Sequence, residues 1–183
     1  GRVFALTVVL HATLTVSAAA AAYPEKPIRL LTPFSAGSVT DMVARPLATK
    51  LAEAWGQPVV VDNRTGAGGS IAAEFAAKAT PDGHTLLIGA NGPTVINPAL
   101  VKNLPYDSRR AFTPITLTAT NNLLMAVPVS LPVKSVGELI ALAREKPGHV
   151  RYGTQGIGSA GNLSGEMLQA MTGAVFTHVP YKG

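Results

Sequence analysis

The stretch IRLLTPFSAGSVTDMVARPLATKLAEAWG, residues 28–56, contains the local pattern on which the fold depends. Residues 28–32 predict a β-strand, and residues 33–38 predict a loop of small and polar residues. Thr40 and Asp41 then begin a helix, which Gly56 ends. We expect this helix to bury one apolar face, formed by residues at three-to-four spacing: Met42, Val43, Leu47, Leu51 and Ala54.

The same succession is repeated in the residues that follow. Residues 58–62 predict a second strand, whose continuous apolar run is typical of a strand buried on both faces. A glycine-rich loop over residues 63–69 precedes a predicted helix over residues 71–79, with Ser70 as its expected N-cap. Residues 85–89 predict a third strand. This alternation predicts a parallel, doubly wound α/β sheet, in which ligands bind beyond the carboxyl ends of the strands.

A second strand–helix–strand unit begins after an irregular connection over residues 97–114. Here Ser135 and Glu138 match a capping box at the start of a helix. The sheet of this unit has too few strands to close a core, so we expect a two-lobed protein that is truncated at its C-terminus. Lobe 1 is assigned to residues 23–122 and lobe 2 to residues 123–183. The expected elements of lobe 2 are a strand at 123–129, a helix at 136–146, a strand at 150–154, a loop at 155–162, a helix at 163–171 and a strand at 175–179.

The first twenty-two residues have the pattern of a secretory signal peptide. Residues 3–16 are mostly apolar, and the alanines at 18–22 provide an A-x-A cleavage site. Three threonines and a histidine dilute the apolar run, which favours export over a membrane anchor. We therefore expect an exported protein from which these residues are removed.

The composition excludes several classes of protein. The chain has 183 residues, 47% hydrophobic and 14% charged, which excludes disorder for most of its length. It has no cysteine, which excludes thiol catalysis and cysteine-ligated zinc. The formal charge is +5, but the basic residues are scattered and do not alternate with aromatic ones, so no nucleic-acid surface is expected. The excess of basic over acidic residues is compatible with attraction of small anions or with an ordinary solvated surface.

No motif in the chain predicts catalysis, a cofactor or a metal. Residues 156–161 match G-x-G-x-x-G, but a dinucleotide site also needs an acidic residue after the next strand, and residues 175–183 contain none. The glycines at 66–69 are not followed by Lys-Ser/Thr, and no G-x-S-x-G elbow occurs. The four histidines are far apart, so each is expected at the surface or in packing. For Asp41, stabilisation of the helix start and a polar contact to a ligand are equally open.

Three loops thus lack catalytic side chains but are rich in backbone N–H groups at helix starts, as in an anion-binding site. Several charge-assisted hydrogen bonds to such groups give a carboxylate a binding free energy of about −8 kcal/mol after the cost of ordering. This corresponds to micromolar affinity.

Five motifs resemble the tripartite tricarboxylate transporter substrate-binding proteins, also called the Bug family. These motifs are PFSAGSVTDMVAR at 33–45, VDNRTGAGG at 61–69, PDGHTLL at 81–87, YGTQGIGS at 152–159 and HVPYKG at 178–183. The resemblance covers essentially all of the segment after the signal peptide. It implies a periplasmic binding protein with a type II-like fold, which closes two α/β lobes on a small organic acid. It also implies delivery of that acid to a permease of two integral membrane subunits, and no enzyme activity.

The resemblance also implies where the ligand binds. The carboxylate would lie between the loop after the first strand and the glycine-rich loop of the second lobe, held by backbone amides and water, with residues 91–94 lining the cleft. The ligand would be a di- or tricarboxylate or an acidic amino acid. Arg64 could pair with a second carboxylate or be a surface residue. The expected ligand-binding residues are Phe34, Ser35, Ala36, Gly37, Ser38, Thr40, Asp41, Asn91, Thr94, Gly156, Gly158, Ser159 and Asn162.

Two departures from the family pattern and two alternatives accompany this interpretation. The first loop reads Ser-Ala-Gly-Ser where many members have Pro-Gly-Gly, and the C-terminal part that completes lobe 1 is absent. One alternative is an α/β enzyme, a dehydrogenase or an esterase, with its catalytic residues in that missing part. The other is a sensor that binds the same ligand and signals to a membrane receptor. For a binding protein, lobe motion is expected about residues 123–129.

Overall fold

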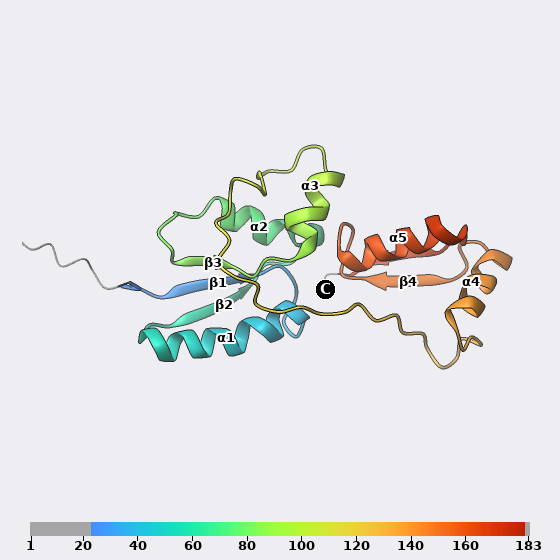
Figure 1. The fold of residues 1–183 in the computed structure, drawn as a ribbon, viewed down its shortest axis with the longest axis horizontal. Helices are drawn as coiled ribbons and strands as arrows, with labels where there is room; N and C mark the ends of the chain where they lie inside the picture. Colours follow the sequence, from blue (N-terminus) through green and yellow to red (C-terminus); the bar gives the residue numbers. More distant parts are fainter. Residues whose placement is uncertain (1–22, 182–183) are drawn as a thin grey trace, which may run out of the picture.

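The computed structural model describes residues 23–181, so the predicted signal peptide at residues 1–22 lies outside the described residues. Two modules follow each other along the chain (Figure 1). The first module contains β1 (Ile28–Thr32), α1 (Val39–Trp55), β2 (Val59–Asn63), the 3₁₀ turn η1 (Ala67–Gly69), α2 (Ser70–Ala77), β3 (Thr85–Leu87), the π-helical turn η2 (Gly92–Ile96) and α3 (Asn97–Leu100). The second module contains α4 (Val136–Glu145), β4 (Arg151–Thr154), α5 (Ala160–Thr172) and β5 (Thr177–Pro180).

Both modules are built on parallel strands, which confirms the predicted α/β fold. The first sheet has the order β2-β1-β3, and Leu30 of β1 lies opposite Val61 on one side and Leu86 on the other. In the second module β4 pairs with β5. Figure 1 shows α1 on one face of the first sheet and α2 on the other. The carboxyl ends of the strands therefore point toward the loops that begin the helices.

Helix α1 packs on the sheet through small side chains. Ala44 and Ala48 are buried against Leu30 and Ile88, with Leu47 packed beside them. The predicted apolar face was wrong at Met42, which is 67% exposed, and at Ala54, which is also exposed. Because alanine has almost no side chain, the stripe through Ala44 and Ala48 approaches the strands most closely and turns Met42 toward solvent.

Two strand predictions need correction. β2 is an edge strand, and Val60 at its centre is 56% exposed, so the strand is not buried on both faces. Residues 123–129 form no strand but an exposed extended segment between the modules, with Leu124 at 92% exposure (Figure 1). Its sequence has strand propensity, but a strand also needs a hydrogen-bonding neighbour, and the described residues provide none there. The lobe boundary at residues 122 and 123 falls in this segment and stays a prediction.

The second module has its own small core. Leu139 and Ala143 of α4 pack on Ala174 and Phe176, which both lie just before β5. The predicted cap at Ser135 is confirmed, because its hydroxyl accepts the Glu138 N–H. Between residues 23 and 181, no helix is both long and apolar enough to cross a bilayer.

Candidate ligand-binding site

The loop from β1 to α1 is fixed by the helix that follows it. Ser38 is the N-cap of α1, and its hydroxyl accepts the Asp41 N–H at 3.4 Å. Ala36 and Gly37 are exposed, whereas Phe34, Ser38 and Thr40 are half-buried. Ser35 is also half-buried. The loop thus presents its backbone at the start of a helix, where N–H groups lack intrahelical partners.

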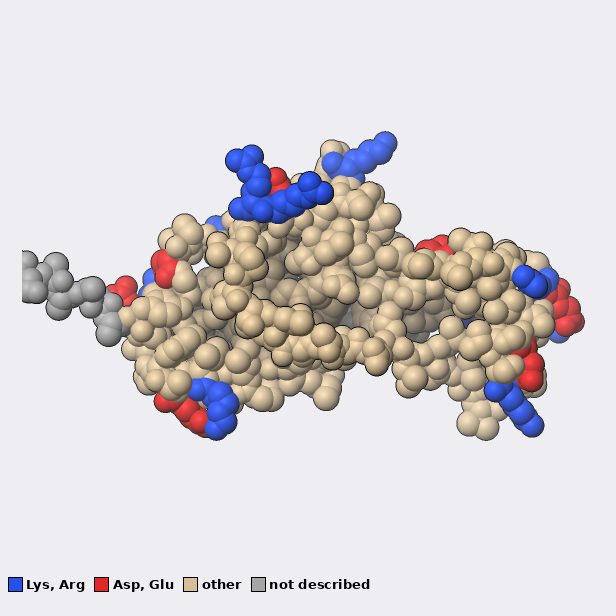
Figure 2. Space-filling model, viewed as in Figure 1, with Lys and Arg blue, Asp and Glu red and all other residues tan. Residues whose placement is uncertain are grey.

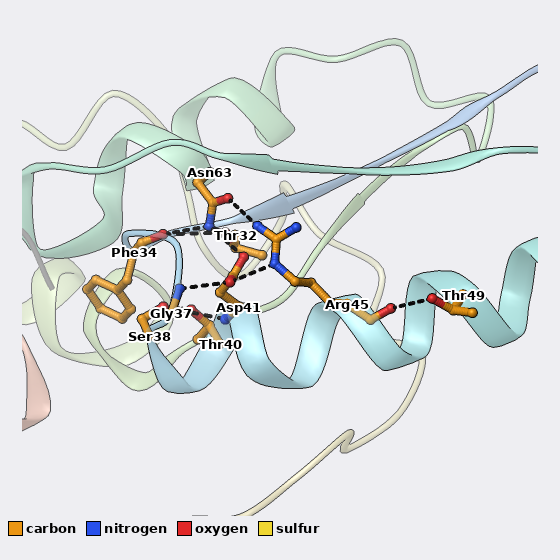
Figure 3. A network of polar contacts seen from close by, with 9 residues as sticks. All are labelled: Thr32, Phe34, Gly37, Ser38, Thr40, Asp41, Arg45, Thr49 and Asn63. Carbon is orange, nitrogen blue, oxygen red and sulfur yellow. Dashed lines mark hydrogen bonds and ion pairs between the residues drawn. The ribbon is translucent and has the colours of Figure 1, made fainter.

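The carboxylate of Asp41 faces the protein and binds three donors (Figure 3). The Gly37 N–H and Arg45 Nε donate to it at 2.8 Å each, and Asn63 Nδ2 donates at 3.0 Å. The Arg45 hydrogen bond above all, and then the Gly37 N–H, lower the pKa of Asp41 to about 2. Asp41 is therefore ionised at neutral pH, and its oxygens already hold the loop in place. This geometry favours the helix-start interpretation of Asp41 over a direct ligand contact.

Asn63 connects this loop to the end of β2, and the sequence analysis missed it. Its amide also donates to Thr32 Oγ1 at 2.6 Å and to the Phe34 carbonyl at 3.0 Å. Asn63 lies at the carboxyl end of a parallel strand. That position is the signal that could have identified it, because side chains there meet the loops of neighbouring strands.

The loop from β4 to α5 repeats the same local structure in the second module. Ser159 is the N-cap of α5, and its hydroxyl accepts the Asn162 N–H at 3.2 Å. Asn162 Oδ1 accepts the Gly158 N–H at 3.1 Å, just as Asp41 accepts the Gly37 N–H. The predicted helix start at residue 163 was too late by three residues. Ser159 is the N-cap, so the helix begins at Ala160, within the segment that was predicted as a loop. Gly156, Gly158, Ser159 and Asn162 are all buried.

The third predicted loop, residues 91–94, begins η2. Asn91 is exposed, and the Thr94 hydroxyl donates to the Ala90 carbonyl at 2.7 Å. Gly92 is buried against one loop from each module: a Cβ there would lie 2.7 Å from the Gly68 carbonyl oxygen and 3.1 Å from that of Gly158. The structure therefore brings the loops at 66–69, 91–94 and 156–159 together.

The loop after β1 reaches this meeting point through Pro33. A Cβ on Gly69 would lie 2.9 Å from Pro33 Cβ and 3.2 Å from Pro93. Ser70 was predicted as the cap of α2, which is wrong: Gly69 is the N-cap, and the Ser70 hydroxyl accepts Asn97 Nδ2 at 2.7 Å. Asn97 is 2% exposed and was not predicted as a functional residue.

A hollow of about 240 Å³ lies at the carboxyl end of β4, lined by Gly153, Thr154, Gln155 and Tyr181. The hydroxyl of Thr154 is 2.7 Å from His178 Nε2. Tyr181 follows β5 and is 66% exposed. Gln155 and Tyr181 were not predicted as site residues, although both directly follow the ends of parallel strands.

The sequence pattern of the "Tripartite tricarboxylate transporter family receptor" matches residues 43–183. The chain belongs to this family. It is therefore related to solute receptors and not to enzymes, and the dehydrogenase or esterase alternative is not supported.

Individual members of the receptor family agree with this assignment. BugT of Bordetella pertussis is 36% identical over 185 residues, covering 100% of this chain and 57% of BugT. A UPF0065 protein of the same species is 39% identical over 169 residues, covering 91% of this chain and 51% of its own length. The chain thus spans about half the length of the curated relatives it matches.

Two solved structures are similar in fold and sequence. The first is R. palustris Rpa4515 with adipate, at a TM-score of 0.84 and 43% identity, covering 88% of this chain and 54% of that one. The second is MatC of Rhodopseudomonas palustris with bound malate, at a TM-score of 0.78 and 30% identity, covering 88% of this chain and 55% of that one.

Arg64 does not lie among the loops of this candidate receptor site. Its guanidinium bonds Asp62 at 3.0 Å and stacks on Phe75, 4.6 Å from the ring centroid. These contacts favour the surface interpretation. A further hollow of about 360 Å³ lies beside Phe75, on the outer side of α2. Within residues 23–181, no group of three or more His, Asp or Glu is placed to hold a metal.

Proposed function

We propose that this protein is a periplasmic solute-binding protein that captures a small organic carboxylate. The observation that carries the proposal is the pair of matching helix starts at Ser38 and Ser159. At each, a serine and the residue three positions later fix a loop whose backbone N–H groups lie at a helix N-terminus. Two such ends, one from each module, suit the two oxygens of a carboxylate.

The family supports the ligand class. The relatives with solved ligands hold adipate and malate, which are both dicarboxylates. We assign the two binding lobes to residues 23–122 and 123–183, with closure about residues 123–129. The hollow lined by Gln155 and Tyr181 adjoins the second loop and is offered as the place for the far end of the ligand.

The test is thermal stabilisation of the full-length protein by adipate, malate, citrate and glutamate. A ligand at a hundred times its dissociation constant adds about 2.7 kcal/mol to the free energy of unfolding. Adipamide, which has the length of adipate without its charges, is the matched control. Stabilisation by at least one acid and none by adipamide is expected, whereas no response to any acid would contradict carboxylate capture.

A pair of variants places the ligand at the first loop. Ala36→Asp adds a negative charge to the exposed loop, and Ala54→Asp adds the same charge at the other end of α1. Repulsion at short range makes the first variant bind the acid about tenfold more weakly or worse. The second variant should keep the wild-type dissociation constant by calorimetry. Equal affinities would place the ligand elsewhere.

Delivery to a permease of two integral membrane subunits is the second part of the proposal, and it rests on family membership. Affinity purification of the ligand-bound protein from solubilised membranes is expected to retain both subunits. Loss of ligand uptake on deletion of the permease would separate transport from sensing, and unchanged uptake would count against delivery.

A further inference from the structure

Three glycines meet where the two modules touch. Gly68 follows β2, Gly92 follows β3, and Gly158 follows β4 of the other module; all three are buried. Figure 1 shows the modules approaching each other here, between α3 and the start of α5. On the face seen in Figure 2, charged side chains lie away from this narrow junction. Among residues 23–181, none of the ion pairs joins the two modules.

The contact leaves no room for a side chain on any of the three glycines. A Cβ on Gly68 would overlap the Ile157 carbonyl oxygen, and one on Gly158 would overlap Asn97 Oδ1. These contacts join the first module to the second. Around Gly68 and Gly92 most of the opposing atoms are backbone, which cannot move aside as a flexible side chain would. Opposite Gly158 they belong to the side chain of Asn97.

Asn97 is held rigidly in its place. Its Nδ2 donates to Ser70 Oγ at 2.7 Å and to the Ala67 carbonyl at 3.2 Å. The hydroxyl of Tyr106 donates to the Pro93 carbonyl at 2.7 Å, which ties η2 to the same cluster. With Nδ2 committed to two acceptors inside the first module, Oδ1 is turned toward Gly158 and cannot rotate away without losing both bonds.

Gly158 is equally fixed on the other side. Its N–H is bound by Asn162, and its φ of +77° lies in the left-handed region. A positive φ alone would explain glycine at 68 and 158, but it does not explain Gly92, which has no such backbone conformation. At Gly92 only the closeness of Gly68 and Gly158 requires the missing Cβ.

We propose that Gly68, Gly92, Gly158 and Asn97 form a seam that sets how closely the two modules approach. In this seam Asn97 and Gly158 are positioning residues, because their contact determines the distance between the two helix starts that hold the ligand. Only the effect of the seam on affinity rests on the proposed function.

The decisive comparison is Gly158→Ala against Gly173→Ala. Both glycines flank α5 and both have positive φ, +77° and +67°. A Cβ at Gly173 would have nothing within 4 Å, whereas one at Gly158 would meet Asn97. The two variants therefore share the backbone strain and differ in the contact between modules. Circular dichroism and thermal unfolding show that each variant folds.

The separation of the modules is measured by energy transfer in the full-length protein. Lys50 of α1 and Glu145 of α4 are exposed and belong to different modules. Residues 1–183 contain no cysteine, so cysteines introduced at these two positions are labelled specifically once any cysteine outside these residues has been replaced by serine. Distances are recorded without ligand and with saturating adipate. Gly158→Ala is expected to lengthen the distance in at least one condition relative to Gly173→Ala. Equal distances in both conditions would overturn the proposal.

A second measurement tests Asn97 itself. In the Gly158→Ala background, Asn97→Ala removes the atom that the new methyl group meets, so it should restore the shorter distance. A failure to restore it would overturn the assignment of Asn97. Adipate affinity should fall about tenfold in Gly158→Ala and recover in the double variant, because the binding-competent state becomes less populated.

The outcomes keep the two proposals apart. If the distances differ as expected but no acid binds the wild-type protein, carboxylate capture fails and the seam stands. If acids bind but Gly158→Ala and Gly173→Ala give equal distances and affinities, the seam fails and capture stands.

Discussion

The helix starts at Ser38 and Ser159 have the same hydrogen bonds but different charges. In the first module, the acceptor for the glycine N–H is the carboxylate of Asp41; in the second it is the amide of Asn162. The buried carboxylate is matched by Arg45 and Asn63, whereas the Asn162 amide has long contacts, 3.4 Å to Glu166 and 3.5 Å to Tyr152. A buried charge requires a compensating charge as well as hydrogen bonds, whereas a buried neutral amide requires hydrogen bonds alone. The first loop is therefore expected to be the more firmly fixed of the two.

The largest expected effect on stability comes from replacing, one at a time, the two side chains that accept the glycine N–H groups, Asp41 and Asn162. Asp41→Ala leaves the Gly37 N–H, Arg45 and Asn63 without their acceptor and should lower the free energy of unfolding by about 3 kcal/mol. Arg45 is more than half exposed, so water replaces part of that contact. Asn162→Ala should cost about 1–2 kcal/mol. Urea denaturation of both variants measures the difference, and equal costs would show that charge does not distinguish the two loops.

The charge of Asp41 also predicts how stability depends on pH. Its pKa falls from 3.8 to about 2 on folding. Folding thus favours the ionised form of Asp41. Its contribution to the free energy of unfolding is fully present above about pH 4 and is lost as the pH falls through about 2. The stability difference between wild type and Asp41→Asn should shrink by about 2 kcal/mol over that range.

Ser159→Ala, which removes a neutral hydrogen bond from the second module, is the control for this pH series. Its stability difference from wild type should stay constant between about pH 4 and pH 2. A wild-type minus Asp41→Asn difference that did not change with pH would mean that Asp41 is not the titrating group.

The smallest expected effect concerns the capping serines. Ser38→Ala and Ser159→Ala should each cost about 1 kcal/mol, typical of an N-cap. Ser159 is 2% exposed, whereas Ser38 is half-buried beside Thr40 Oγ1 at 3.1 Å. Water and Thr40 can compensate at Ser38, so the Ser159 variant should be the less stable of the two in thermal unfolding. The reverse order would show that burial does not set the strength of these caps.

Local patterns in the sequence predicted most of the elements. The strand at 28–32, the cap at Ser135 and the helix end at Gly56 depend on residues a few positions apart, and all three are observed. The predictions for residues 123–129, for Ser70 and for Val60 failed because each outcome depends on the surroundings of the segment and not on its own residues. A strand needs a neighbour, a cap depends on the preceding turn, and burial of a strand depends on what covers it.

The sequence by itself determined the alternation of strands and helices and the Gly-Ser-x-x-Asp/Asn starts of α1 and α5, because hydrophobic periodicity and capping act within one or two helical turns. Only the tertiary structure decided that Asp41 turns inward to Asn63, and that Gly68, Gly92 and Gly158 meet beside Asn97. Those contacts join residues far apart in the chain, so they depend on how sheets and helices pack and not on any local pattern.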